Sequence, residues 1–177
     1  MQKKKSMKKP TAKTAAKKLA IATFGAGCFW GVQGIFDEVP GVVETTVGYM
    51  GGDEKKHPNL TYGLVCSHTT NYAEVVQVVF DEMRVSYEKL LDVFWSSHDP
   101  TTMNRQGSDV GSQYRSAVFY SNDAQKKAAL AAKARLQKMM GEKRKVVTEI
   151  TKAGTFFRAE EYHQKYLEKN GLKSCHI

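Results

Sequence analysis

The sequence LAIATFGAGCFWG, residues 19–31, joins an expected strand to an expected helix through a short glycine-containing turn. Small and large apolar residues alternate over residues 19–24, which predicts a buried first strand. The helix is predicted over residues 28–36, before Pro40 and Gly41. Cys28, at its start, feels the positive end of the helix dipole, which favours the thiolate over the thiol. The stretch therefore indicates a cysteine nucleophile, with a buried structural cysteine as the alternative.

The rest of the chain continues this mixture of strands and helices. Further strands are predicted over residues 42–49, 73–80, 116–120 and 146–150, and further helices over residues 86–94, 122–140 and 160–169. Two long segments, 50–70 and 98–112, lack helical or strand periodicity. Loops of that length in a compact domain are usually functional. The pattern predicts an α/β or α+β sandwich whose site is assembled from loops.

Charge divides the chain of 177 residues into two parts. The net charge is +9, but eight lysines lie among residues 1–18, and without them 19 basic side chains stand against 18 acidic ones. We expect a disordered basic tail over residues 1–18 and a single catalytic domain over residues 19–177. A basic tail can also bind nucleic acid or acidic lipid, but solvation is the simpler interpretation and no specific nucleic-acid partner is expected. No apolar run approaches the roughly 20 residues of a transmembrane segment.

The cysteines favour a reducing compartment. Cys28, Cys66 and Cys175 are too few for a disulfide framework, and no cysteine or histidine pair has metal-ligand spacing, so we expect a cytoplasmic chain without a bound metal. The basic start and the Gly27–Cys28 junction also resemble a lipoprotein signal, but the apolar run between them is shorter than the usual signal core of roughly 7 to 15 residues. The common phosphate-binding glycine spacings are missing, so a nucleotide cofactor is not expected.

The residues alone are compatible with two kinds of cysteine chemistry. A cysteine hydrolase would need a histidine and a supporting side chain beside Cys28, and His98 with Asp99, or His163, could supply them. The second kind uses a carboxylic acid and tyrosine hydroxyls that together hold a polar oxygen. Partial burial would raise the pKa of such an acid and let it donate a proton near neutral pH. The candidate side chains are Tyr62, Glu74, Asp109 and Tyr114.

Seven blocks of sequence, in order along the chain, resemble the A-type peptide methionine sulfoxide reductases. The blocks are GCFWG (27–31), Tyr62 with VCS (65–67), YAEVV (72–76), HDPT (98–101), NRQG (104–107), DVGSQYRS (109–116) and EYHQ (161–164). Any one block is weak, whereas the ordered set is specific, and the resemblance as a whole runs from about residue 19 to residue 163. The expected fold is then α+β: a two-layer sandwich of a mixed, mainly antiparallel sheet with helices, a ferredoxin-like split βαβ core and a loop-rich C-terminal segment.

The resemblance implies the reaction and the partners. Enzymes of this type reduce one epimer of methionine sulfoxide to methionine and so repair oxidised proteins. The implied substrates are the S epimer in proteins and free methionine sulfoxide, with no bound cofactor and with thioredoxin or a similar dithiol as the electron donor. A monomer is expected.

The resemblance also implies a role for each polar candidate. Cys28 would attack the sulfoxide sulfur and end as a sulfenic acid, while Glu74 would protonate the sulfoxide oxygen. Tyr62 and Tyr114 would hydrogen-bond that oxygen, and Asp109 would order the polar side of the pocket. The alternatives are a solvated edge residue for Glu74, core tyrosines, and a turn cap for Asp109.

Aromatic residues and a second thiol complete the implied site. Phe29 and Trp30 would hold the S-methyl group, with ordinary core packing as the alternative. Cys175 follows the helix-breaking pair Asn170–Gly171 and is expected to be the resolving cysteine, which condenses with the sulfenic acid. Cys66 is expected to be structural, in a segment that leads from loop to strand, and is the alternative resolving residue.

The chain departs from the expected family pattern just before Glu74. Asn71–Tyr72 stands where Gly-His is expected, and residues 67–70, Ser-His-Thr-Thr, replace a glycine-containing turn. The loop before Glu74 is therefore expected to differ in shape from the family pattern.

Overall fold

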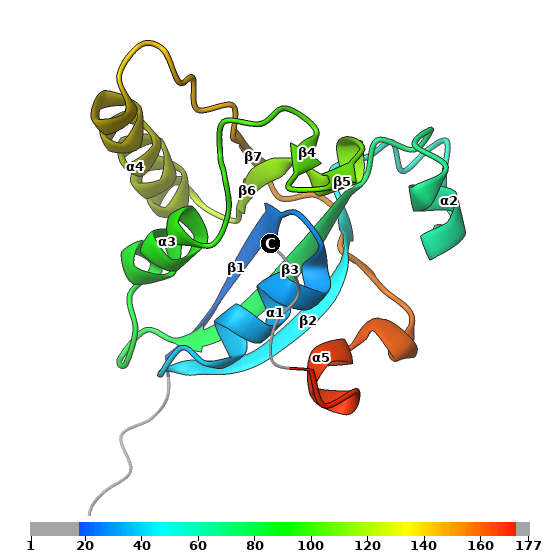
Figure 1. The fold of residues 1–177 in the computed structure, drawn as a ribbon. Coiled ribbons are helices and arrows are strands. Elements are labelled where there is room, and N and C mark those ends of the chain that lie inside the picture. The colour runs from blue at the N-terminus through cyan, green and yellow to red at the C-terminus, as the bar shows by residue number, and fades with distance from the viewer. Residues whose placement is uncertain (1–17, 173–177) are drawn as a thin grey trace, which may run out of the picture.

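The computed structural model describes residues 18–172, so the tail up to residue 17 and Cys175 lie outside the described residues. The strands are β1 (Leu19–Ala26), β2 (Val42–Met50), β3 (Ala73–Asp81), β4 (Arg105–Gln106), β5 (Asp109–Val110), β6 (Ser116–Tyr120), β7 (Glu149–Lys152) and β8 (Phe157–Arg158). The helices are α1 (Phe29–Asp37), α2 (Tyr62–Cys66), α3 (Tyr87–Ser96), α4 (Asp123–Met140) and α5 (Tyr166–Lys169), with 3₁₀ turns η1 (Ser112–Tyr114) and η2 (Glu161–His163). Figure 1 shows their arrangement.

A mixed sheet with the strand order β7-β6-β1-β3-β2-β8 organises the described part of the chain. β1 pairs antiparallel with β3 and β6, and β3 pairs antiparallel with β2. Helix α1 connects β1 to β2, and β3 lies between these two strands, which is a split βαβ arrangement. β7 adds a parallel edge strand beside β6, and β8 adds a short antiparallel one beside β2. The predicted α+β class and mainly antiparallel sheet are confirmed.

The main core lies between the sheet and helices α1, α3 and α4 (Figure 1). Phe24 of β1 stacks against Phe36 of α1 and Phe94 of α3, with ring centroids 5.1 and 5.2 Å apart. A smaller cluster, which includes Val75 and Phe119, lies on the other face of the sheet, because side chains alternate between faces along a strand. The helices cover one face, as the two-layer prediction requires.

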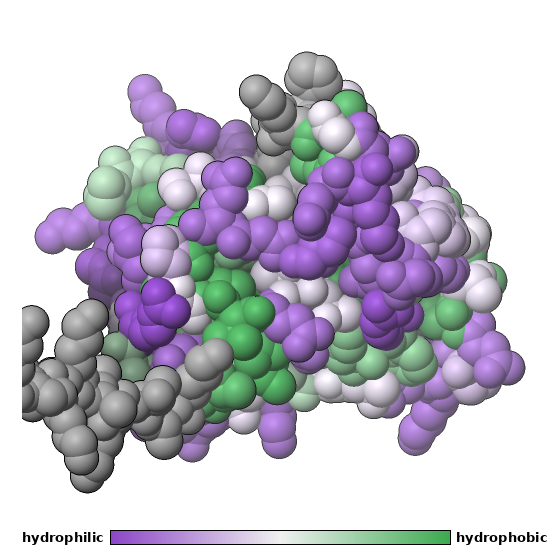
Figure 2. Space-filling model, turned by 90° about the horizontal axis from the view of Figure 1, so that it is seen from below, coloured by the Kyte–Doolittle hydropathy of each residue, from purple (hydrophilic) through white to green (hydrophobic). Residues whose placement is uncertain are grey.

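The first half of β1 is more exposed than its sequence suggested. Leu19 and Ile21 are 53% and 43% exposed, whereas the strand is buried from Ala22 onward, so the expectation of a wholly buried first strand is wrong. Figure 2, seen from below, shows one face on which an apolar area is surrounded by hydrophilic side chains. Among residues 18–172, no helix has the length and apolarity needed to cross a membrane.

The two predicted loops contain short elements that periodicity cannot reveal. Segment 50–70 includes the single-turn helix α2, whose first turn is capped because the Thr61 hydroxyl accepts from the Leu64 N–H at 3.3 Å. Segment 98–112 includes the two-residue hairpin strands β4 and β5. An element of two to five residues is too short to show the recurrent spacing of apolar residues by which a helix or strand is recognised in a sequence. Both segments are otherwise irregular.

The strand predicted over residues 146–150 begins later, at Glu149. The N–H of Val146 donates to the side chain of Gln137 at 2.8 Å, and the N–H of Val147 donates to the Pro100 carbonyl at 2.9 Å. Pairing with β6 therefore starts only where Glu149 reaches Ala117.

The helix predicted over residues 160–169 is broken into η2 and α5. Lys165 has a left-handed φ of 54°, which an α-helix does not accommodate. The Gln164 side chain pairs with both the N–H and the carbonyl of Val47, at 3.0 and 2.9 Å, and the Lys165 N–H donates to Gln33 at 2.7 Å. These bonds to other elements replace the helical ones.

Candidate active site

Cys28 lies at the junction of β1 and α1, one residue before the helix begins. It is the N-cap residue, and its carbonyl accepts from the Val32 N–H at 3.4 Å, so α1 begins at Phe29 and not at Cys28 as predicted. The preceding Gly27 has a φ of 92°, and a Cβ there would lie 2.7 Å from Cγ of Gln106. Only glycine fits this turn, because other residues would meet both strain and a clash. The turn holds Cys28 at the end of the sheet.

Glu74 lies on the central strand β3 and is 2% exposed, so it is not a solvated edge residue. Its Oε2 accepts from the Phe29 N–H at 3.1 Å, at the start of the helix that Cys28 caps. Burial raises the pKa of Glu74 to about 8; the Phe29 N–H opposes this shift and the charge of Asp109 adds to it. The carboxyl group is therefore largely protonated at neutral pH and can donate a proton.

Tyr62 comes from the first long segment and Tyr114 from η1, at the end of the second, and both lie close enough to Glu74 for its charge to affect their hydroxyls. Burial raises the pKa of both hydroxyls, and the charge of Glu74 raises both further. Tyr62 also forms a side-chain hydrogen bond with Cys66 and is affected by Tyr114, while Tyr114 is affected by Asp109, Cys66 and Cys28. Both tyrosines stay protonated at physiological pH and can donate hydrogen bonds.

Asp109 belongs to the same cluster. It is the first residue of β5 in the small hairpin, opposite Gln106, and is partly exposed. Its negative charge contributes to the raised pKa values of Glu74 and Tyr114. The structure thus places in one cluster the five residues predicted to be catalytic, which are Cys28, Tyr62, Glu74, Asp109 and Tyr114.

The two aromatic residues after Cys28 have different surroundings. Phe29 is 1% exposed, and its ring packs against those of Tyr49 and His163 with centroids 5.8 and 5.2 Å away. Trp30 is partly exposed and stacks on Tyr166 at 3.8 Å, and its indole N–H donates to Nδ1 of His163 at 3.0 Å. Both rings therefore rest on the C-terminal segment.

Glu160 is a supporting residue that the sequence analysis missed. One carboxylate oxygen accepts from the Tyr62 N–H at 2.9 Å and the other from the Tyr49 hydroxyl at 3.1 Å. It therefore attaches α2 to the C-terminal segment. The only signal in the sequence is the acidic pair Glu160–Glu161 at the start of the EYHQ block, which does not distinguish Glu160 from its neighbour.

Cys66 and the two candidate histidines, His98 and His163, differ from what the sequence predicted. Cys66 is the last residue of α2 and not part of a loop that leads into a strand, so its predicted location is wrong. Both ring nitrogens of His98 are engaged, Nδ1 with the Phe94 carbonyl at 2.8 Å and Nε2 with the Ser116 hydroxyl at 2.6 Å. Nδ1 of His163 accepts from the Trp30 indole N–H, so the proton of the neutral ring is on Nε2 and its acceptor nitrogen is already used. In both rings, therefore, the nitrogens that a hydrolase base would need are bonded to other residues.

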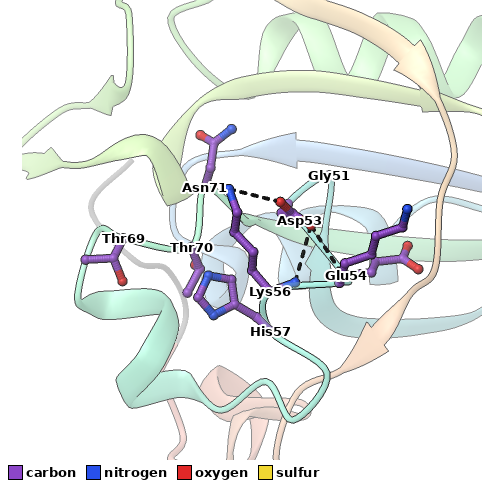
Figure 3. Close-up of a pocket in the computed structure, with 10 residues that line it drawn as sticks. Gly51, Asp53, Glu54, Lys56, His57, Thr69, Thr70 and Asn71 are labelled. Carbon is purple, nitrogen blue, oxygen red and sulfur yellow. Dashed lines mark hydrogen bonds and ion pairs between the residues drawn. The ribbon is translucent and has the colours of Figure 1, made fainter.

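A cavity of about 720 Å³ opens beyond the ends of β2 and β3 (Figure 3). It is lined by residues 51–57 and 69–71, none of which is a predicted site residue. Asp53 lies at its wall and binds the side chain of Lys56 and the N–H groups of Lys55 and Lys56. Within residues 18–172, no cluster of three or more potential metal ligands is present.

Comparison with known proteins identifies the arrangement. The model of the family described as peptide methionine sulfoxide reductase matches residues 20–177. A peptide methionine sulfoxide reductase MsrA of Methanothermobacter thermautotrophicus is 56% identical over 156 residues, which are 88% of this chain and 90% of that protein.

Solved structures agree with the sequence match. The crystal structure of reduced Mxr1 from Saccharomyces cerevisiae has a TM-score of 0.80 at 37% identity and covers 89% of this chain and 88% of its own. The structure of Mxr1 in complex with Trx2 has a TM-score of 0.57 at 25% identity and covers 89% and 91% of the two chains.

Proposed function

Since this chain belongs to the peptide methionine sulfoxide reductase family, we propose that it reduces the S epimer of methionine sulfoxide, free or in proteins, to methionine by attack of Cys28 on sulfur. The observation that supports this assignment is the contact between Glu74 and the Phe29 N–H, which places a protonated acid at the helix start capped by Cys28. The nucleophile can then attack the sulfur of a sulfoxide group while the acid protonates its oxygen.

The first step transfers the oxygen and two electrons. The Cys28 thiolate attacks the sulfoxide sulfur while Glu74 protonates the oxygen, which makes the oxygen a leaving group. The S–S bond formed in this attack breaks when the released hydroxide attacks the Cys28 sulfur, so methionine departs as a thioether with the bonding electron pair and Cys28 ends as a sulfenic acid. The sulfoxide is reduced by two electrons and the cysteine is oxidised by two.

The surroundings match the two sides of the substrate. A methyl sulfoxide is a strong neutral acceptor on a small apolar body, so it needs donors on one side and aromatic carbon on the other. Tyr62 and Tyr114 supply the donors, and Trp30 with Phe29 supplies the apolar surface for the S-methyl group. Asp109 orders the polar side of the pocket. Its negative charge also raises the pKa of Glu74 and so helps to keep Glu74 protonated.

Recycling would use a second thiol. Cys175 would condense with the sulfenic acid to form a disulfide with Cys28 and release water, and thioredoxin or a similar dithiol would then reduce that disulfide. The Mxr1 complex with Trx2 supports thioredoxin as the reductant. We also propose that residues 19–177 form one catalytic domain that acts in the cytoplasm as a monomer, with residues 1–18 as a solvated tail.

Reduction of each sulfoxide epimer tests the proposal. With thioredoxin, thioredoxin reductase and NADPH, the protein should reduce the S-sulfoxide of N-acetylmethionine and leave the R epimer unchanged, and Cys28→Ser should abolish the reaction. Cys175→Ser should release about one methionine per enzyme without turnover. Cys66→Ser is the matched control and should turn over normally; turnover in Cys175→Ser but not in Cys66→Ser would move the resolving role to Cys66.

A further inference from the structure

His68 lies two residues after α2 and contacts the segment that carries Tyr114. Its Nδ1 is 3.0 Å from Oε1 of Gln113, a side chain in η1 that is 2% exposed. An amide oxygen only accepts hydrogen bonds, so Nδ1 of His68 is the donor. The imidazole therefore joins the turn after α2 to the turn that ends at Tyr114.

The backbone conformations of His68 and Gly111 allow the contact between His68 and Gln113. His68 has a left-handed φ of 61°, a conformation that favours glycine, and this turn is where the sequence departs from the glycine-containing pattern. Gly111 has a φ of 147°, and a Cβ there would lie 2.6 Å from Nδ1 of His68 and 2.2 Å from Oε1 of Gln113. The side chains of residues 68 and 113 can meet only because residue 111 has none.

Helix α2 needs attachments because a five-residue helix is not stable by itself. Its N-terminal end is held by Glu160, which accepts from the Tyr62 N–H. The contact between His68 and Gln113 holds its C-terminal end. The chain continues through Thr69 to Asn71 along the wall of the cavity in Figure 3.

We propose that His68 is a positioning residue: its imidazole bridges α2 to η1 and thereby fixes the separation of the Tyr62 and Tyr114 hydroxyls that receive the sulfoxide oxygen. The inference rests on the proposed function. Hydroxyls that act on the oxygen as it gains charge must be in place before the transition state, so a looser α2 slows the chemical step more than it weakens binding.

Single-turnover kinetics without reductant tests the bridge. His68→Gly keeps the backbone conformation and removes the imidazole, and methionine release from saturating N-acetylmethionine-S-sulfoxide should slow by about twofold to fivefold, as expected for one neutral hydrogen bond. The apparent substrate dissociation constant should change less than this rate. His68→Asn should restore the rate in part, because an asparagine amide can donate and tolerates a positive φ. Asn71→Gly is the matched control, since Asn71 has a φ of 55° in the same connection between α2 and β3, and it should leave the rate unchanged.

A double-mutant cycle separates bridging from a general loss of structure. In a Gln113→Met background the acceptor is gone, so His68→Gly should cause no further slowing. A wild-type rate in His68→Gly, or the same slowing in both backgrounds, would overturn the bridge. Failure of the proposed function would look different, because the unmodified protein would then release no methionine at all.

Discussion

Two halves of the site are built in different ways. Cys28 and Glu74 lie at a helix start and on a central strand, and the two elements are linked by the Phe29 N–H, which donates to the Glu74 carboxyl group at 3.1 Å. Tyr62 lies on a five-residue helix within the first long irregular segment, and Tyr114 lies on a 3₁₀ turn at the end of the second. The side chain of Glu160, from the C-terminal segment, holds the Tyr62 N–H.

The difference shows where precision comes from in this protein. The nucleophile and the acid derive their positions from the sheet and the main core, which cannot shift without unfolding. The oxygen-binding side depends on individual hydrogen bonds, each of which contributes about 1 kcal/mol. Substitutions in the first half should therefore cost far more activity than substitutions in the second.

The largest effect is expected for Glu74→Gln. The amide fills the same space but cannot donate a proton from an acid, so the single-turnover rate should fall by about 100-fold or more while substrate affinity stays nearly unchanged. In the unmodified protein the rate should fall as pH rises through about 8, where Glu74 loses its proton. A pH-independent rate between pH 7 and 9 would remove Glu74 from the acid role.

The same residue links catalysis to stability. In the unfolded chain Glu74 loses its proton near its ordinary pKa of 4.5, whereas in the fold it keeps the proton to about pH 8. The native state binds more protons across this window, so Glu74 lowers the stability of the fold increasingly as pH rises from about 4.5 to 8. The melting temperature of Glu74→Gln should therefore exceed that of the unmodified protein by more at pH 9 than at pH 5.

The next effect concerns the oxygen-binding side. Tyr62→Phe and Tyr114→Phe each remove one hydroxyl and should slow methionine release by about tenfold, as for one hydrogen bond to a charged transition state. The doubly substituted protein should lose less than the product of the two factors if both hydroxyls bind one oxygen. Tyr162→Phe, at an exposed tyrosine of the C-terminal segment, is the control and should keep the full rate. Independent, multiplicative losses would contradict a shared oxygen.

The same division explains what could be predicted from sequence. The first strand, the helix after Cys28 and the strand of Glu74 follow from apolar periodicity, and the structure confirms these elements apart from the exposed Leu19 and the one-residue shift of the helix start. Helix α2 could not be predicted because one turn shows no periodicity. The roles of the site residues remain predictions from the resemblance.

Hydrogen bonds between side chains and residues far apart in the chain also could not be predicted from the sequence. The helix expected over residues 160–169 breaks because Gln164 pairs with Val47 of β2, a contact between residues 117 positions apart. Glu160 reaches Tyr62 across 98 positions for the same reason. Such bonds depend on which loops the folded sheet brings together, and local propensity does not contain that information.

The smallest effect is expected at the attachment of α2. In Glu160→Gln the amide oxygen can still accept from the Tyr62 N–H, but the charge is lost. Burial opposes that charge, yet the Tyr62 N–H and the Tyr49 hydroxyl lower the pKa of Glu160 and keep it ionised. The rate should fall by about twofold to threefold, measured in the same single-turnover assay. A loss as large as that of Glu74→Gln would show that the two halves of the site are equally rigid.

Chemical trapping of the oxidised cysteine tests the central claim most directly. Cys175→Ser is treated with one equivalent of N-acetylmethionine-S-sulfoxide in the presence of dimedone, which labels sulfenic acids, and the labelled peptide is located by mass spectrometry. The account predicts one label, on Cys28, formed together with one released methionine. A label on Cys66, or methionine release with Cys28 unlabelled, would contradict it.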